Sequence, residues 1–311
     1  MPRPFRFGIQ TSRAGSAQEW ADKARRIEDL GYSSLFIPDH FGDQFAPLIA
    51  LQAAAGATSS LRLGTLVLDN DYRHPLVLAK EWATLDVLSN GRLEAGLGAG
   101  WMKSDYDESG MAYDAPATRI DRFKEGIAII KGLFTNEGPF SFAGKHYTIT
   151  NAQPLPRPVQ KPHPPILIGA GAKRMTRVAA READIVSVNF SLAEGVVNPT
   201  VALTGTAAAT HEKVAWMRES AGSHFDELEL SCTVFVSMVT DDRAGMAERI
   251  GGGFGMPPDE VLKTPHVLVG TTDEIAEDIQ RRREEFGFSY IVFSGDFYEQ
   301  LAPVVKQLAG T

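Results

Sequence analysis

Two titratable side chains, Asp39 and His40, directly follow the apolar run Leu35-Phe36-Ile37-Pro38. Such a run is typical of a buried strand, and a proline suits its end. An imidazole at a strand end can act as a general acid or base near neutral pH, and an adjacent carboxylate can influence its tautomer or charge. The structural alternative is that Asp39 caps the next segment and His40 is an ordinary polar residue at the start of a loop. The place of this strand end in the fold decides between the two interpretations.

Glycines alternate in the segment RLEAGLGAGW (92–101), at positions 96, 98 and 100. In a strand they fall on one face, where they allow a planar ring or another backbone to approach closely. The segment is not a dinucleotide fingerprint, because Trp101 stands where that motif requires its third glycine. The alternative is that large neighbouring side chains simply pack against these glycines.

A second glycine-rich turn, Gly169-Ala170-Gly171, joins the run PILIGA to a basic helix that contains Lys173, Arg174 and Arg177. Free backbone N–H groups at a helix start, together with these cations, can hold an anion. The dinucleotide spacing fails here as well, because Arg174 occupies the place of the third glycine. In a chain of formal net charge −8, a local cationic cluster favours an anion site over a merely solvated helix end.

Several other functions are disfavoured by the sequence. It contains no P-loop, no His-Glu-x-x-His, no Cys/His ligand spacing and no Gly-x-Ser-x-Gly, so we expect no metal and no acyl-transfer nucleophile. The negative net charge argues against nucleic acid as a partner. There is no apolar run of about 18 residues and no signal-peptide core. The single cysteine, Cys232, cannot form an internal disulfide. We therefore expect a cytoplasmic protein with no membrane attachment.

Strand-like and helix-like segments alternate along the chain. The pattern predicts strands at 5–10, 33–38, 61–68, 92–100, 165–170, 183–188, 227–239 and 289–295. Helices are predicted at 16–30, 46–57, 75–89, 117–134 and 206–221, with further helical material from the seventh strand to about 286. Insertions interrupt the rhythm at about 136–164, where FSFAGKHYTI predicts a hairpin before a proline-dense connector, and at about 189–204 and 251–265.

Eight strands separated by helices in 311 residues predict one domain, residues 1–311, with the (β/α)8 TIM-barrel fold. An open doubly wound sheet fits less well, because the first turn, QTSRAGSA, carries no phosphate fingerprint. In a barrel, the active site lies at the carboxyl ends of the strands. This rule places the following residues at one end of the barrel: Gln10, Asp39 and His40, the residues after Leu66-Val67, Ala99-Gly100-Trp101, Gly169–Gly171 and Asn189.

The segments FRFGIQ, LGYSSLFIPDH, LRLGTLVLDNDYRHPLVLAKEWATLDVLSNGRLEAGLGAGW, PPILIGAGAKRMTRVAAREADIV and VLVGTTDEIAEDIQRRREEFGFSYIVF together resemble the bacterial luciferase-like superfamily. Within it, they are most similar to oxidoreductases that use the deazaflavin coenzyme F420. The resemblance covers about residues 5–308, and ATLDVLSNGRLEAGLGAGW is its most specific part. It implies the same barrel, a small-molecule substrate and a homodimer.

The resemblance also implies roles for individual residues. His40 matches the active-site histidine, with Asp39 beside it, and a non-proline cis peptide at Leu66-Val67 is expected to support the isoalloxazine ring. The other residues implied to bind the cofactor are Gly98, Ala99, Gly100 and Trp101 at the end of the fourth strand. Gly169, Ala170, Gly171, Lys173 and Arg174 are expected at its phosphate and carboxylates.

One departure from the family concerns the substrate. Trp101 stands where the glucose-6-phosphate dehydrogenases of this superfamily carry a catalytic glutamate, so a sugar-phosphate reaction is not expected. The implied function is hydride transfer between F420 and an unidentified small organic substrate, with His40 donating or accepting the accompanying proton. The alternatives are an FMN-dependent monooxygenase of the same fold and a non-catalytic flavin-binding relative.

Overall fold

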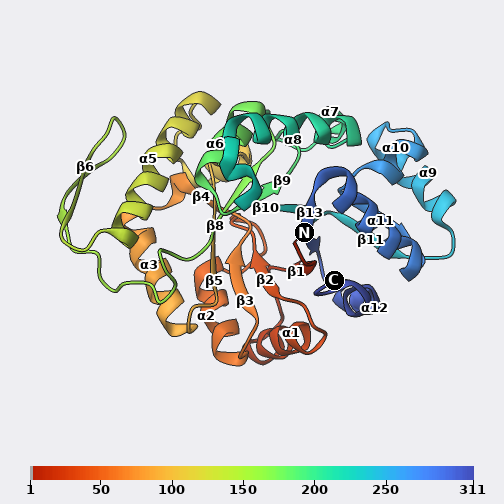
Figure 1. The fold of residues 1–311 in the computed structure, drawn as a ribbon, viewed down its shortest axis with the longest axis horizontal. Coiled ribbons are helices and arrows are strands. Elements are labelled where there is room, and N and C mark those ends of the chain that lie inside the picture. Colours follow the sequence, from red (N-terminus) through yellow and green to blue (C-terminus); the bar gives the residue numbers. More distant parts are fainter. Residues whose placement is uncertain (1–2) are drawn as a thin grey trace.

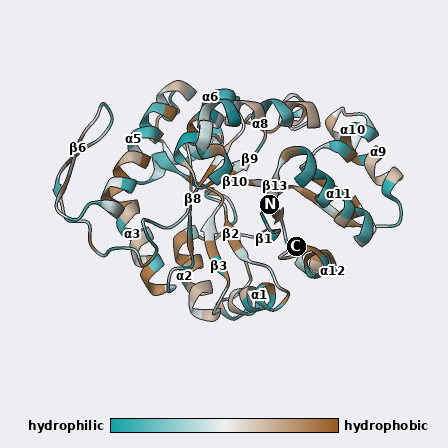
Figure 2. Ribbon diagram, in the orientation of Figure 1, coloured by the Kyte–Doolittle hydropathy of each residue, from teal (hydrophilic) through white to brown (hydrophobic). Residues whose placement is uncertain are grey.

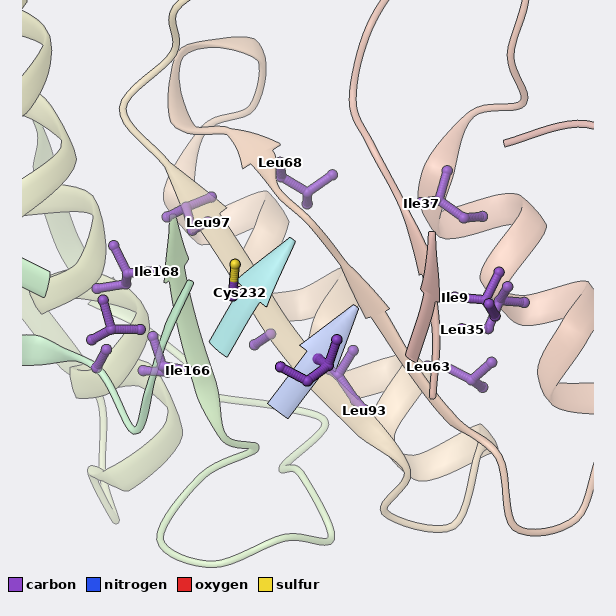
Figure 3. Packing of buried hydrophobic residues seen from close by; sticks show 14 of the residues in the cluster. Ile9, Leu35, Ile37, Leu63, Leu68, Leu93, Leu97, Ile166, Ile168 and Cys232 are labelled. Carbon is purple, nitrogen blue, oxygen red and sulfur yellow. The ribbon is translucent and has the colours of Figure 1, made fainter. Parts of the chain in front are cut away.

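Successive side chains of the central strands belong to two different apolar layers. In the computed structural model, which describes residues 3–311, Leu35 and Ile37 of strand β2 (Ser34–Ile37) pack in the layer shared with the helices, whereas Phe36 belongs to a cluster made of strand residues. Because both faces of β2 are buried, its apolar residues occupy successive positions rather than alternating with polar ones. Figure 3 shows the outer layer, with Ile9, Leu93 and Ile168 among the labelled side chains.

Eight parallel strands close into a barrel. They are β1 (Arg6–Gln10), β2, β3 (Arg62–Thr65), β5 (Leu93–Gly98), β8 (Ile166–Ala170), β9 (Ile185–Val188), β10 (Glu229–Val234) and β13 (Phe288–Ser294). Each strand pairs with the next in this order, and β13 pairs with β1, which closes the ring. The predicted (β/α)8 barrel is therefore confirmed.

Helices surround the strands (Figure 1). Their bounds are α1 (Ala17–Asp29), α2 (Pro47–Ala57), α3 (Pro75–Leu88), α4 (Lys103–Ser109), α5 (Pro116–Thr135), α6 (Lys173–Glu182), α7 (Pro199–Leu203), α8 (Ala207–Ala221), α9 (Arg243–Phe254), α10 (Pro258–Lys263), α11 (Thr272–Phe286) and α12 (Tyr298–Leu308), with 3-10 turns η1 (Asn70–Tyr72) and η2 (Gly222–Glu227). Hydrophilic residues are concentrated on helices such as α6 and α11 (Figure 2). Within residues 3–311, none of these helices combines the length and apolarity needed to cross a bilayer.

The hairpin predicted in the first insertion is present. Strands β6 (Phe140–Ala143) and β7 (Thr148–Ala152) pair antiparallel and project from one side of the barrel (Figure 1). The connector that follows contains two cis X–Pro bonds, Leu155-Pro156 and Lys161-Pro162.

Two predicted strands are divided in the structure. The strand expected at 61–68 ends at Thr65 and resumes as the short β4 (Leu68–Asp69), so that Leu66 and Val67 lie in the gap. The strand expected at 227–239 is interrupted at Phe235, and its second part, β11 (Val236–Val239), leaves the barrel.

Strand β11 pairs with β12 (Val267–Gly270), a segment that the sequence pattern had assigned to helical material. That prediction was wrong because a run as short as VLVG has no periodicity that separates a buried strand from a helix. Helices α9 and α10 pack against β12, on the side of the barrel away from the hairpin (Figure 1).

Candidate active site

A cavity of about 540 Å³ lies at the carboxyl ends of the strands. The parallel arrangement explains its position, because the ends of all barrel strands meet at one rim. Most of the residues predicted from the sequence come together in its wall: Asp39, His40, Leu66, Val67, Gly98, Ala99, Gly100, Trp101, Gly169, Ala170 and Gly171. Gln10 and Asn189, which the strand-end rule also selected, line it as well.

His40 is oriented by a carboxylate from helix α4. Its Nδ1 lies 2.7 Å from Oδ2 of Asp105, whose side chain is 5% exposed. The Tyr72 hydroxyl donates a hydrogen bond to the same carboxylate oxygen at 3.2 Å. Because an ionised carboxylate can only accept, it places the imidazole proton on Nδ1 and leaves Nε2 to exchange a proton. The Trp101 ring packs edge-on against the imidazole, with 5.7 Å between the ring centroids.

Asp39 is engaged by other partners. Arg73 donates hydrogen bonds to its two oxygens at 2.6 and 3.2 Å, and the backbone N–H of Asp69 donates a third at 3.0 Å. These contacts connect the end of β2 to β4 and to the segment that follows it. The sequence left open whether Asp39 tunes His40 or caps a loop; the carboxylate in contact with the imidazole is Asp105.

Sequence reasoning missed Asp105 because the short helix α4 that carries it was not predicted. The sequence feature that could have indicated Asp105 is its position four residues after Trp101, close behind the end of β5. A carboxylate at that spacing is too common on a helix to be singled out without the fold.

Asp69, also in the cavity wall, is a third buried carboxylate. Its Oδ2 lies 2.9 Å from the Tyr106 hydroxyl, and the backbone N–H of Asp71 donates to its Oδ1 at 2.8 Å. Burial, with a further contribution from the charge of Asp71, raises the pKa of Asp69 to about 7. Asp71 itself is paired with Arg122, which donates to both of its oxygens at 2.7 and 2.6 Å. Asp69 can therefore hold a proton near neutral pH.

The Leu66–Val67 peptide bond is cis, which confirms the expectation drawn from the resemblance. The Gln10 side-chain amide donates a hydrogen bond to the Leu66 carbonyl oxygen at 2.7 Å. On the neighbouring strand, a Cβ on Gly98 would lie 2.7 Å from Cγ2 of Val67, so only glycine leaves room for that side chain. A Cβ on Gly96 would overlap the Thr65 carbonyl oxygen. The alternating glycines thus allow β3 and its interrupted end to lie close against β5.

Lys173 and Arg174 lie outside the cavity wall, contrary to their predicted place at the mouth. Arg174 forms an ion pair with Asp121 at 2.6 Å, and the Lys173 ammonium lies 5.3 Å from the centre of the Trp216 ring. Both line a separate hollow whose other cationic members are Lys124, Arg177 and Arg181. Helix α6 is amphipathic and buries Met175, Val178 and Ala179, so its first two residues face solvent.

Arg119 is a cation of the cavity wall that the sequence did not single out. It lies in the first turn of α5, is 3% exposed, and stacks 4.2 Å from the centre of the Tyr113 ring. One of its terminal nitrogens donates to the Asp114 carbonyl at 2.7 Å, while Nε has no hydrogen-bond partner among the described residues. No carboxylate within residues 3–311 forms an ion pair with it. A buried cation without such compensation is costly, and it favours an anionic ligand.

The amino end of helix α6 lies on the same cavity. Gly171, Ala172 and Met175 line the wall there, and the N-cap residue Ala172 has no side chain that could cap the helix. The first backbone N–H groups of a helix attract anions. Together with Arg119, they provide an electropositive region at this part of the cavity.

The model of the luciferase-like monooxygenase family matches residues 3–250 of this sequence. The chain belongs to that family. A relative from Nakamurella multipartita, named F420-dependent glucose-6-phosphate dehydrogenase, is 30% identical over 99% of both chains. A 5,10-methylenetetrahydromethanopterin reductase from Methanopyrus kandleri is 28% identical over 94% of this chain and 83% of its own length.

Solved structures show the same fold over 98–99% of the chain. An F420-dependent secondary alcohol dehydrogenase in complex with an F420-acetone adduct superposes with a TM-score of 0.76 at 18% identity, covering 98% of both chains. The long-chain alkane monooxygenase LadA gives the same TM-score at 16% identity, covering 99% of this chain and 92% of its own. At these identities the likeness establishes the fold.

Proposed function

We propose that this protein exchanges a hydride between coenzyme F420 and a small organic substrate, with His40 transferring the accompanying proton. The observation that carries the proposal is the His40–Asp105 pair, set in a cavity whose wall contains the Leu66–Val67 bond and both glycine-rich turns. The names of the full-length relative from Nakamurella and of several shorter matches support F420 as the cofactor.

The residues of the cavity fit such a cofactor. Its phosphate would be held by Arg119 and the amino end of α6, after the turn Gly169–Gly171, where a buried guanidinium nitrogen has no partner among the described residues. Its ring would be held by Leu66 and Val67 across from Gly98. When bound, the deazaflavin supplies or accepts the hydride.

Side chains of the protein transfer the proton that accompanies the hydride. Asp105 keeps a proton on Nδ1 of His40, so that Nε2 is the atom that accepts a proton when the substrate is oxidised and returns it when the substrate is reduced. In the protonated state, the Asp105 carboxylate stabilises the imidazolium. Tyr72 holds that carboxylate, and the edge of Trp101 limits rotation of the imidazole.

We infer that the substrate is not a sugar phosphate. Trp101 stands beside His40 in place of the glutamate expected in dehydrogenases of that specificity. Of the lysine and arginine residues described in the structure, Arg119 is the one that lines the cavity, and the cofactor's phosphate requires it. A second phosphate would have no cation to receive it.

Parallel titrations with F420 and with FMN test the choice of cofactor. We expect F420 to bind with micromolar or tighter affinity, measured by the change in its fluorescence, and FMN to bind much more weakly. Micromolar binding of FMN with no binding of F420 would favour the monooxygenase alternative.

Two matched variants test the anion site. Arg119→Met should weaken F420 binding at least tenfold and reduce its dependence on salt, because it removes the buried cation. Arg174→Met removes a surface cation already paired with Asp121 and should change the affinity less than threefold. A larger effect of Arg174→Met than of Arg119→Met would restore the original prediction for the phosphate.

A further inference from the structure

One section of the cavity wall comes from segments outside the barrel strands. It is formed by residues of the loop and helix at 190–202, by Phe235 between β10 and β11, and by residues of 250–267 around α9, α10 and the start of β12. The apolar side chains used in this argument are Phe190, Val197, Val201, Phe235, Phe254 and Val261. Phe190 and Phe235 stack with 5.4 Å between their centroids. We call this part of the wall the apolar section.

The apolar section has the surface properties of a binding site for an uncharged molecule. Val197, Phe235 and Phe254 are 62%, 38% and 37% exposed, although they are large and apolar and line a cavity. Clustered exposed apolar side chains around a concave site mark a surface that a ligand covers. Among the described residues of this section none is a lysine, arginine, aspartate or glutamate, so a charged ligand group would be unpaired there.

His266, the residue before β12, supplies a polar group with unused hydrogen-bonding capacity in this section. Its side chain is buried, and its ring lies 4.3 Å from that of Phe190 and 5.8 Å from that of Phe235, measured between centroids. Its Nδ1 lies 2.8 Å from the Thr233 carbonyl oxygen. Its Nε2 is buried without a hydrogen-bond partner among residues 3–311.

These contacts determine the tautomer of His266. A carbonyl oxygen can only accept, so the proton must lie on Nδ1. Burial lowers the pKa of His266 to about 3, so the ring is neutral at physiological pH and Nε2 carries a lone pair. The unused atom is therefore a hydrogen-bond acceptor, and a partner has to be a donor.

We propose that the apolar section binds the body of an uncharged, largely apolar substrate, and that His266 Nε2 accepts a hydrogen bond from a hydroxyl or N–H group of that substrate. The inference rests on the proposed function in one respect, because the molecule bound there is taken to be the partner of the cofactor in hydride exchange. His266 is thus a specificity-determining residue that lies apart from the proton-transferring His40.

The physical reason for selectivity is the cost of a buried acceptor without a partner. In the free protein, Nε2 is already buried and has no partner among the described residues, so a ligand with a hydroxyl or N–H group gains a hydrogen bond there that a ligand without a donor cannot make. A carboxylate brings a charge that no side chain of the apolar section offsets.

Three probes test the proposal: 4-butylcyclohexanol, its methyl ether and 4-butylcyclohexanecarboxylate. They share the 4-butylcyclohexyl group and differ in the polar group that they present to His266. Binding is measured by isothermal titration calorimetry, on the protein alone and on the protein saturated with F420. We expect the alcohol to bind at least tenfold more tightly than the ether and the carboxylate. Equal affinities for alcohol and ether, or tighter binding of the carboxylate, would overturn the proposal.

Two variants test whether the preference for the alcohol over the ether arises at His266. His266→Phe keeps a buried ring without an acceptor, and should bring the alcohol and the ether within twofold of each other. His211→Phe changes an exposed histidine that is paired with Glu285 and should keep the tenfold preference. If His266→Phe fails to fold, the three probes on the unaltered protein still decide. If the protein prefers the alcohol but does not bind F420, the proposed function is contradicted and the role of His266 is supported. If it binds F420 but shows no preference for the alcohol, the role of His266 is contradicted and the proposed function is supported.

Discussion

The two ends of the barrel both hold buried carboxylates beside arginines, yet they are built differently. At the amino ends of the strands, Glu94 is fully buried and paired with Arg6 and Arg62, and the Tyr290 hydroxyl donates to it at 2.9 Å. Burial alone would raise the pKa of Glu94, but the two guanidinium groups bring it below its usual value. This end is a compensated ionic cluster.

At the carboxyl ends, compensation is incomplete. Burial raises the pKa of Asp69 to about 7, Arg119 has no carboxylate partner among the described residues, and His40 keeps 27% of its side chain exposed. The groups at this end can still take up a proton or a charged ligand, whereas those at the other end cannot. The comparison teaches that the amino end serves stability and the carboxyl end serves chemistry.

The largest expected effect is on turnover, from His40→Ala. Loss of the proton-transferring group should lower kcat by roughly 10²–10⁴, while the affinity for F420 changes less than threefold. The measurement is the rate of F420 reduction, followed by its visible absorbance, with an alcohol that the unaltered protein oxidises. Unchanged turnover would remove His40 from the mechanism and favour the non-catalytic alternative.

At the amino ends of the strands, Glu94→Ala should lower the stability of the protein and leave the active site intact. It removes the buried partner that Arg6 and Arg62 share, although Arg6 keeps its pair with Glu229. Breaking a buried pair costs about 3–5 kcal/mol of unfolding free energy. Denaturant unfolding measures this loss. Glu299→Ala, which breaks an exposed pair with Arg26, is the matched control with a much smaller effect. If the two variants were equally stable, the amino-end cluster would have no special role.

Asp105→Asn should have an intermediate effect on turnover. It removes the charge that stabilises the protonated imidazole, so kcat should fall about 10- to 100-fold. Asp107→Asn, two residues further along α4 and paired with Lys103 at the surface, should leave kcat unchanged. An unchanged kcat in Asp105→Asn would show that the carboxylate charge has no part in the proton transfer.

Asp69→Asn should change the pH dependence of stability. Because the folded-state pKa of about 7 lies above the unfolded value of about 3.9, the folded protein binds the extra proton. This contribution is fully present below about pH 4 and is lost as pH rises to 7, at up to about 1.4 kcal/mol per pH unit. Unfolding curves at pH 5 and 8 should therefore differ less in the variant than in the unaltered protein. Equal differences would show that Asp69 has an ordinary pKa.

The barrel and the core of its site could be predicted because they depend on local patterns. Regular alternation of strands and helices defines the fold, and the strand-end rule then places His40 and Gly171 at one rim. The bond between Leu66 and Val67 was anticipated from the family resemblance alone.

The remaining features depend on contacts between distant segments. Asp105 meets His40 across 65 residues of sequence, and nothing local distinguishes Arg119 from the neighbouring Arg122, which pairs with Asp71. Strand β12 gains its conformation from pairing with β11, and that pairing also brings His266 into the apolar section. Such residues become recognisable when the topology is known.

The crystal structure of the protein with F420 bound tests the central claim most directly. We predict that the deazaflavin ring lies against Leu66 and Val67 within reach of His40, that the phosphate contacts Arg119, and that the apolar section stays free for the substrate. A ring bound in the apolar section, or a phosphate held by Lys173 and Arg174 away from Arg119, would contradict the division of roles described above.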